Sequence, residues 1–207
     1  MTVTDFEFIC QILRERSGLV LTNDKAYLLE SRLLPVARKW KLATFDDLVR
    51  VIRSKMDEAV IRDVVEAMTT NESFFFRDTK PFEQFKALVL PALLKSRASS
   101  RTIRIWSAAC SSGQEPYSLA MILSEMAAQL NGWKLVKYFA QIGDRWQINA
   151  KIRGMVQYKE FNLLQDPMPL GRFDVVFCRN VLIYFDQPTK TRVLNSVAKL
   201  MPEDGFL

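Results

Sequence analysis

One short segment constrains the fold of this chain more than any other, because residues 103–118 predict a strand, a tight loop and the start of a helix. Apolar and polar residues alternate at 103–105, and six small residues follow at 107–112 before a glycine. Pro116 then stands in the first turn of an apolar helical pattern, where its missing N–H costs nothing. In an α/β sheet such a loop lies at the carboxyl end of the strand, so the segment predicts a ligand site there.

The loop lacks both of the common glycine motifs for phosphate binding. A phosphate loop would carry Gly-Lys-Ser/Thr, and a dinucleotide loop would carry spaced glycines, whereas this loop has only Gly113. Glu115 stands where a bound phosphate would need a positive helix end. The loop therefore favours a ligand with a cationic amine or hydroxyl groups. The alternative is an ordinary strand-to-helix turn, and spacing alone does not decide between the two.

Two further segments, Met68–Arg77 and Phe173–Asp186, join the loop in a resemblance to a known family. They contain Thr-Asn-Glu-Ser-Phe-Phe-Phe-Arg and Cys-Arg-Asn-Val-Leu-Ile-Tyr-Phe, and the loop segment reads Trp-Ser-Ala-Ala-Cys-Ser-Ser-Gly-Gln-Glu-Pro-Tyr-Ser. In order and approximate spacing the three resemble the CheR-type methyltransferases, over nearly the whole chain. The resemblance implies a cytoplasmic, monomeric protein-glutamate O-methyltransferase that uses S-adenosylmethionine. Its partners would be methyl-accepting chemoreceptors. The enzyme would work beside these membrane receptors without inserting into the membrane itself.

The chain divides into a helical part and an α/β part. Residues 1–68 carry only helical periodicity and predict a small helical bundle. Helix starts are expected at Thr4, Asn23 or Asp24, Thr44 and Asp57. Strands and helices alternate from 81 to 207, which predicts a mostly parallel sheet; the resemblance implies the Rossmann-like sheet of S-adenosylmethionine-dependent methyltransferases. Residues 69–80 link the parts and, by the resemblance, contribute to the cofactor site. Pro35 predicts a kink or a break in the second helix.

The α/β part should also contain a small antiparallel β-subdomain at about 136–158. The main elements are expected as helices at 81–94, 116–130 and 188–200 and strands at 101–107 and 174–178. The subdomain strands are expected at 136–139, 145–148 and 155–158, a place that docks the receptor in the family. A family segment is missing near 135–137, where relatives have a strand ending in the acid that holds the cofactor ribose. The identity of that acid therefore stays open.

Composition excludes several kinds of chemistry. The chain has no histidine, which rules out a histidine base, a histidine-ligated metal and a catalytic triad. Its three cysteines lack metal-binding spacing, so we expect free thiols in a reducing cytoplasm and no metal. No secretion signal or membrane span is evident. The net charge of +6 lies in residues 71–207, but the chain has no nucleic-acid recognition pattern, so no nucleic-acid partner is expected.

Methyl transfer to a glutamate carboxylate suits a chain without histidine. An unperturbed glutamate has a pKa of about 4.3 and is already ionised at neutral pH, so no general base is needed. The protein has to position and desolvate the reactants. Two alternatives stay open: a catalytically inactive relative that binds the cofactor or docks proteins in chemosensory signalling, and an unrelated methyltransferase for nucleic acid or small molecules.

The resemblance assigns the site residues by position. Those expected to bind the cofactor are Asn71, Ser73, Arg77, Ala108, Glu115, Asn162, Leu163, Arg179 and Asn180. Arg77 and Tyr184 are expected to be catalytic: Arg77 would hold the carboxylate of the cofactor or of the incoming glutamate, and Tyr184 would orient a carboxylate. Each has a structural alternative, such as a helix-dipole acid for Glu115 and an asparagine turn for Asn162. A basic face that aligns glutamate-rich receptor helices, or else merely a solvated surface, is predicted from Arg32, Arg38, Arg50 and Arg53.

Overall fold

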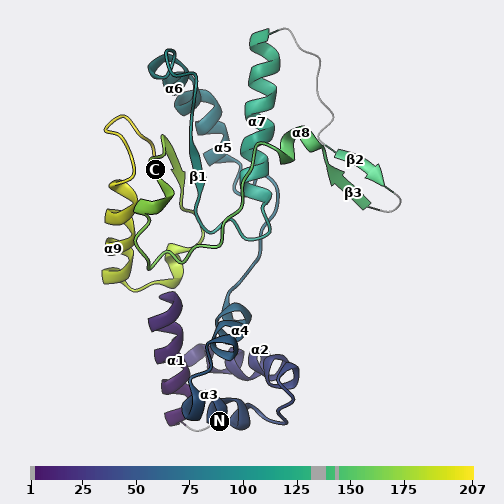
Figure 1. Ribbon diagram of the computed structural model, residues 1–207, viewed down its shortest axis with the longest axis vertical. Helices are drawn as coiled ribbons and strands as arrows, with labels where there is room; N and C mark the ends of the chain where they lie inside the picture. Colours follow the sequence, from purple (N-terminus) through teal and green to yellow (C-terminus); the bar gives the residue numbers. More distant parts are fainter. Residues whose placement is uncertain (1–2, 132–138, 143–144) are drawn as a thin grey trace. The chain divides into compact units, whose positions relative to one another are not determined.

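The computed structural model describes residues 3–131, 139–142 and 145–207 (Figure 1). The chain splits into two compact units. Unit 1 comprises Met1–Thr70, Asn162–Asp166 and Asn180–Ser196. Unit 2 comprises Asn71–Phe161, Pro167–Arg179 and Val197–Leu207. Unit 1 therefore combines the N-terminal part of the chain with two segments, 162–166 and 180–196, from its C-terminal half.

Unit 1 is built on a bundle of short helices. Their bounds are α1 Val3–Ser17, α2 Ala26–Lys39, α3 Phe45–Lys55 and α4 Glu58–Met68, with a 3₁₀ turn, η1, at Asn23–Lys25 before α2. Thr44 begins α3 with a reciprocal capping box, in which the Asp47 N–H donates to Thr44 Oγ1 at 3.1 Å and the Thr44 N–H donates to Asp47 Oδ2 at 3.2 Å. Asp57 caps α4 by accepting from the Ala59 N–H at 2.9 Å. These two predicted helix starts are confirmed.

Helix α2 continues through Pro35, so of the predicted kink or break, the break is wrong. Proline cannot donate to the carbonyl of Ser31, but both residues are exposed and water can satisfy that carbonyl. On the opposite side, Leu33 and Val36 are buried in the core and hold the helix against its neighbours. The predicted start of this helix at Asn23 or Asp24 falls on the 3₁₀ turn η1 instead.

One apolar core holds the helices of unit 1 together. Fully buried side chains from α1, α2, α3 and α4 include Ile9, Leu13, Leu29, Leu33, Leu48, Ile52 and Val64. Each such side chain contributes about 1.5–3 kcal/mol on burial, which stabilises helices too short to persist alone. At the end of α1, Gly18 adopts φ 77°, and a Cβ there would lie 3.0 Å from the ring of Phe185. Helix α1 therefore ends against a segment from late in the chain.

Unit 2 contains the parallel strand pair of the α/β part. Strand β1 (Ile105–Ser107) pairs with β4 (Val175–Phe177), with Ile105 opposite Val175 and Ser107 opposite Phe177. Phe206 extends this arrangement through a parallel bridge to Val175. Both strands are shorter than the sequence predicts, but their parallel pairing and their alternation with helices agree with the predicted fold class.

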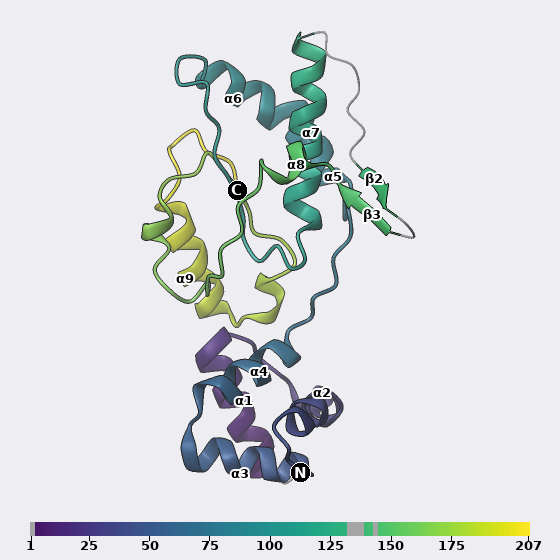
Figure 2. The same ribbon diagram turned by 45° about the vertical axis from the view of Figure 1, so that its right-hand side comes forward.

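Helices pack against this strand pair through an aromatic core (Figure 1 and Figure 2). A continuous helical stretch consists of α5 (Lys80–Gln84), the π-helical turn η2 (Phe85–Val89) and α6 (Leu90–Ser96), and α7 spans Gln114–Asn131. Phe82 and Phe85 lie 6.1 and 5.9 Å from Phe177, measured between ring centroids. The sequence predicts one regular helix at 81–94; the π turn precedes Pro91, which cannot donate the regular helical hydrogen bond.

A hairpin and a short helix follow α7 in the described chain. Strand β2 (Phe139–Ile142) pairs antiparallel with β3 (Arg145–Ile148), and α8 (Ala150–Arg153) buries Ile152 against α7. The stretch 155–158, predicted as a strand, is irregular, because the amides of Met155 and Val156 donate to carbonyls of α8 and continue its turn. Residues 136–138 of another predicted strand lie outside the described residues, as does the position near 135–137 where a family segment is missing. The remaining described elements are η3 (Met168–Leu170), η4 (Leu182–Tyr184) and α9 (Gln187–Ala198).

Candidate active site

The loop after β1 has a backbone that explains its small residues. Ala109, Ser111 and Gly113 adopt left-handed φ values of 62°, 50° and 98°, a region that larger and branched side chains disfavour. The Gly113 N–H donates to the Cys110 carbonyl at 2.9 Å and closes the turn before α7. A Cβ at Gly113 would collide with the hydroxyl of Tyr158. Small residues are therefore required here by both conformation and packing.

Glu115 lies in the first turn of α7 with both carboxylate oxygens bonded. The Ser107 hydroxyl donates to Oε1 at 2.6 Å, and the Arg179 guanidinium donates to Oε2 at 2.8 Å. Burial raises the pKa of the Glu115 carboxyl, while the Ser107 hydrogen bond and the charges of Arg179 and Arg77 act in the opposite direction. Ser107 ends β1 and Arg179 follows β4, so the parallel pairing of these strands brings the acid and the guanidinium together.

Arg179 also binds the segment that precedes α5. Its Nη2 donates to the carbonyl of Arg77 and to the carboxylate of Asp78, both at 2.8 Å, and its guanidinium lies 5.4 Å from the ring centroid of Phe82. The Arg179 side chain is only 17% exposed. The Arg179 guanidinium therefore connects Glu115, in the first turn of α7, to residues 77–78. The cofactor-binding role that the resemblance gives to Arg179 stays a prediction.

Arg77 folds back onto its own segment. Its Nη1 donates to the Glu72 carbonyl at 2.6 Å, and its guanidinium lies 5.6 Å from the ring centroid of Phe74. The Arg77 charge is close enough to lower the pKa of Glu115. Arg77, Glu115 and Arg179 therefore share one neighbourhood at the carboxyl ends of β1 and β4.

The other predicted residues of unit 2 flank this cluster. Ala108 is buried, and its N–H donates to the Phe177 carbonyl at 2.7 Å, which continues the β1–β4 pairing. The Asn71 carbonyl accepts a 3.0 Å hydrogen bond from the hydroxyl of Ser111 in the loop. Ser73 is half-buried in the segment that contains Asn71 and Arg77.

The predicted residues Asn162, Leu163, Asn180 and Tyr184 belong to unit 1. Asn162 Nδ2 donates to the Arg16 carbonyl at 2.7 Å, and its Oδ1 accepts from the Leu164 N–H at 3.0 Å. The asparagine turn considered as an alternative is therefore present. Leu163 and Tyr184 are half-buried, and Asn180 is exposed with φ 56°. The Tyr184 carbonyl accepts from the Val20 N–H at 2.9 Å.

Sequence reasoning missed several polar residues that build the cluster. Ser107 and Asp78 hold Glu115 and Arg179, as described above, and Ser118 is a further example. Its hydroxyl donates to the Gln114 carbonyl at 2.7 Å and accepts from the Phe76 N–H at 2.9 Å. The signal for Ser118 was a polar residue inside an apolar helical run, three positions after Glu115 on the same helical face.

The cysteines near the cluster are unsuited to nucleophilic chemistry. Burial raises the pKa of Cys178 to about 11 and also raises the pKa of Cys110, with a smaller contribution from the Glu115 charge in each case. Both thiols are therefore protonated at neutral pH. Within the described ranges, no group of three or more His, Cys, Asp and Glu residues could hold a metal ion. No helix in the described part of the chain is both long enough and apolar enough to cross a membrane.

A cavity of about 430 Å³ lies away from this cluster, at the amino-terminal end of the strand pair. Its lining includes Arg97, which donates to Asp174 at 2.7 Å and through both Nη atoms to Asp204 at 2.7 Å. The carboxylates in the cavity are therefore already bound to Arg97, and the ion pairs brace the ends of α6, β4 and the C-terminal turn. The cavity is therefore separate from the cluster at the carboxyl ends of β1 and β4.

The arrangement in unit 2 defines an α/β cofactor-binding domain. Parallel strands end beside a small-residue loop, and a buried acid begins the following helix, which is the place where such domains bind ligands. The family model described as the CheR methyltransferase all-alpha domain matches residues 4–69, and the CheR methyltransferase SAM binding domain matches 71–136 and 125–207. The chain therefore belongs to the CheR methyltransferase family. Both the family and the fold class predicted from the sequence are confirmed, and S-adenosylmethionine is the cofactor.

Curated relatives agree with the family match. The chain is 37% identical over 242 residues to chemotaxis protein methyltransferase 1 of Pseudomonas aeruginosa, covering 98% of this chain and 87% of that protein. It is 35% identical over 241 residues to chemotaxis protein methyltransferase Cher2 of Pseudomonas putida, with the same coverage. It is 33% identical over 246 residues to chemotaxis protein methyltransferase 1 of Vibrio cholerae, covering 100% of this chain and 88% of that protein. This last alignment is longer than the 207 residues of the chain, so the Vibrio protein has residues without a counterpart here.

The residues of the cluster fit S-adenosylmethionine chemically. The cofactor's amino acid part has an ammonium group, for which the Glu115 carboxylate is an acceptor, and a carboxylate, for which a guanidinium is a donor. The small residues of the loop let the backbone approach a ligand closely. The cluster at the carboxyl ends of β1 and β4 is therefore the candidate cofactor site.

Proposed function

We propose that this protein transfers a methyl group from S-adenosylmethionine to glutamate side chains of methyl-accepting chemoreceptors, forming glutamyl methyl esters. The observation that carries the proposal is the cluster of Arg77, Glu115 and Arg179 at the carboxyl ends of β1 and β4. It offers guanidinium groups for carboxylates but no histidine and no thiolate. Esterification of an ionised glutamate needs neither, because the acceptor oxygen is already anionic.

The reaction requires positioning more than acid–base chemistry. Bound S-adenosylmethionine supplies a methyl group on a positively charged sulfur. A lone pair of the glutamate oxygen forms the new C–O bond as the C–S bond breaks, so no proton has to move. The protein contributes by aligning the reactants and excluding water from the site.

The proposed roles follow from the contacts of each residue. Glu115, held by Ser107 and Arg179, accepts from the cofactor ammonium. Arg77 binds a carboxylate, either that of the cofactor or that of the incoming glutamate, after it releases the Glu72 carbonyl. Further cofactor contacts are proposed for Asn71, Ser73, Ala108, Asn180 and, beside the adenine, Asn162 and Leu163. Tyr184 is proposed to orient a carboxylate through its hydroxyl.

The proposed receptor-binding surface on unit 1 differs from the one predicted from the sequence. Arg32 Nη1 donates to the Met68 carbonyl at 2.9 Å. Arg53 donates to the Thr4 carbonyl at 3.0 Å and to Asp5 at 3.1 Å, and lies 4.6 Å from the ring centroid of Phe8. These two arginines hold unit 1 together, so the proposal places the receptor contact on other basic residues of the unit.

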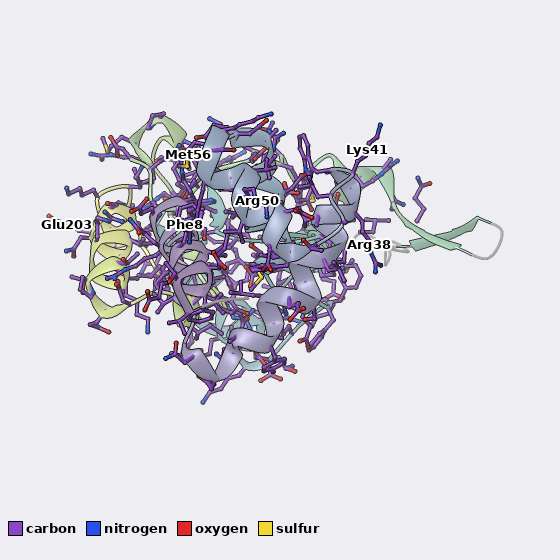
Figure 3. All side chains as sticks on the ribbon, turned by 90° about the horizontal axis from the view of Figure 1, so that it is seen from below. Phe8, Arg38, Lys41, Arg50, Met56 and Glu203 are labelled. Carbon is purple, nitrogen blue, oxygen red and sulfur yellow. The ribbon has the colours of Figure 1, made fainter. Side chains whose placement is uncertain are left out.

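Exposed basic residues remain on α2 and α3 and in the turn after α2. Arg38 and Lys41 are exposed, and Arg50 is 77% exposed beside Asp47 (Figure 3). We name Arg38, Lys41 and Arg50 the basic surface of unit 1. Glutamate-rich receptor helices would be attracted to it electrostatically. A cytoplasmic location and a monomeric state, both expected from the resemblance, are part of the same proposal.

Two measurements test the proposed function. Isothermal titration with S-adenosylhomocysteine should show binding, and absence of binding would contradict the proposed enzyme. Incubation of a chemoreceptor methylation region with methyl-labelled cofactor should place label on the receptor, and mild alkali should release it as methanol. Label that survives alkali would identify an N-methyl product and contradict esterification.

A further inference from the structure

The backbone on both sides of Arg77 adopts a conformation that side chains disfavour. Phe76 has φ 55° and Asp78 has φ 60°. Left-handed φ is uncommon for residues other than glycine, asparagine and aspartate, and bulky residues such as phenylalanine adopt it only under constraint. Such a conformation persists when the surrounding structure determines it. The direction in which Arg77 leaves the chain therefore depends on what holds its two neighbours.

Hydrogen bonds from the strand ends and from α7 hold this segment on both sides of Arg77. Before it, the Phe76 N–H donates to Ser118 Oγ at 2.9 Å. After it, Arg179 Nη2 donates to the Arg77 carbonyl and to the Asp78 carboxylate. All of these residues belong to unit 2. The left-handed residues are thus each fixed by a side chain of the same compact unit that carries Glu115.

The Ser118 hydroxyl both donates and accepts a hydrogen bond within unit 2. Its side chain is completely buried, and its own proton is donated to the Gln114 carbonyl at 2.7 Å, which leaves the oxygen lone pairs to accept from Phe76. Serine is a weaker helix former than alanine, so helix stability does not explain a serine here. The buried hydroxyl is explained by the N–H of Phe76, which would otherwise lose its acceptor.

We propose that Ser118 is a positioning residue for Arg77: its buried hydroxyl fixes the left-handed turn at Phe76 so that the Arg77 guanidinium is held near Glu115. Arg179 fixes the other side of the same turn. The consequence for methyl transfer rests on the proposed function, because it requires Arg77 to bind a carboxylate there. The anchoring of residues 71–79 by Ser118 is independent of any activity.

Ser118→Ala tests the anchoring, and Ser124→Ala is its matched control. Ser124 is also a buried serine of α7, with 8% exposure, so both variants remove one buried hydroxyl from the same helix. Hydrogen exchange measured by mass spectrometry should show faster exchange in peptides covering 71–79 for Ser118→Ala only. Equal exchange of those peptides in the two variants and the wild type would overturn the proposal, whatever the protein's activity.

A double-mutant cycle with Arg77→Ala tests the consequence for the site. If Ser118 acts through Arg77, Ser118→Ala should lower kcat/KM roughly five- to tenfold when Arg77 is present and have little effect when Arg77 is replaced. If Ser118→Ala instead lowers kcat/KM by the same factor with and without Arg77, the loss is one of general stability and the positioning role is overturned. The affinity of the same four proteins for S-adenosylhomocysteine is measured as well. A wild-type protein that neither binds cofactor nor transfers methyl would refute the proposed function, and the exchange experiment would still decide the anchoring.

Discussion

Arg179 donates to Glu115 at 2.8 Å, and this ion pair joins the carboxyl end of β4 to the first turn of α7. The two side chains are 17% and 13% exposed, so water and salt screen the pair less than they screen a surface pair. The negative charge of Glu115 also lies at the amino-terminal end of a helix, where it is favoured. The pair therefore favours the ionised form of a largely buried acid, and Arg179 also binds Asp78.

Arg179→Ala should destabilise unit 2 and increase its dependence on pH. Breaking a largely buried ion pair leaves one charge uncompensated, at a cost of about 3–5 kcal/mol. Burial already raises the pKa of Glu115, and loss of the guanidinium would raise it further. An acid with a raised pKa in the folded state favours folding when protonated. The variant should therefore lose stability as the pH rises from about 4 through that raised pKa.

Thermal unfolding of Arg179→Ala and wild type across about pH 4 to 8 measures this difference. The matched control is Glu115→Gln in the Arg179→Ala background, which removes the titrating group and should abolish the additional pH dependence. An Arg179→Ala variant with the wild-type pH dependence would show that the pair does not govern the ionisation of Glu115.

Arg77→Ala should lower methyl transfer by about two orders of magnitude while leaving the fold intact. The guanidinium is bonded to the carbonyl of Glu72 and lies near the ring of Phe74, and neither contact belongs to a core. The free energy of unfolding should therefore change by less than about 1 kcal/mol. Loss of a charged donor that binds a carboxylate in the site affects the rate far more than it affects stability.

Transfer of labelled methyl to a receptor peptide measures the effect of Arg77→Ala, and circular dichroism checks the fold. Arg77→Lys is the conservative comparison and should retain part of the rate, because lysine keeps the charge but not the planar fork. A wild-type rate in Arg77→Ala would remove this residue from the proposed site.

Gly113→Ala should disturb the loop through two separable effects. The left-handed φ of 98° is unfavourable for alanine, and its Cβ would collide with the Tyr158 hydroxyl. We expect a loss of about 1–3 kcal/mol in stability and weaker binding of S-adenosylhomocysteine. Adding Tyr158→Phe removes the hydroxyl and should restore part of the loss but not the conformational part. Full recovery in the double variant would show that φ at Gly113 has little influence.

Local chemistry made much of the fold predictable, whereas long-range contacts did not. Thr44 and Asp57 were identified as helix caps because a cap depends on residues two or three positions away. The small-residue loop was recognised for the same reason. Ser118 and Asp78 were missed because their partners, Phe76 and Arg179, are 42 and 101 residues distant and meet them only in the folded unit.

The same limitation explains other differences between the expected and the observed contacts. The helical pattern predicts Arg53 as a surface cation. In the fold of unit 1 its guanidinium also hydrogen-bonds to Thr4 and Asp5. Pro35 reads as a helix breaker, but the tertiary packing of α2 is worth more than one lost hydrogen bond on the exposed side. The sequence at 155–158 predicts a short strand, but a strand needs a partner, and the described part of the chain gives this stretch none.

The last prediction concerns the basic surface of unit 1. Arg38→Gln with Lys41→Gln should raise the KM for a glutamate-rich receptor region at low salt and leave S-adenosylhomocysteine affinity unchanged. Both residues are exposed, so the changes should not disturb the core. Lys95→Gln with Lys199→Gln removes the same charge from exposed positions outside this surface and is the matched control. Screening at 0.15 M salt acts over about 8 Å, so added salt should reduce the difference between wild type and the surface variant. Equal KM values for the two double variants at low salt would mean that net charge alone attracts the receptor and that this surface has no specific role.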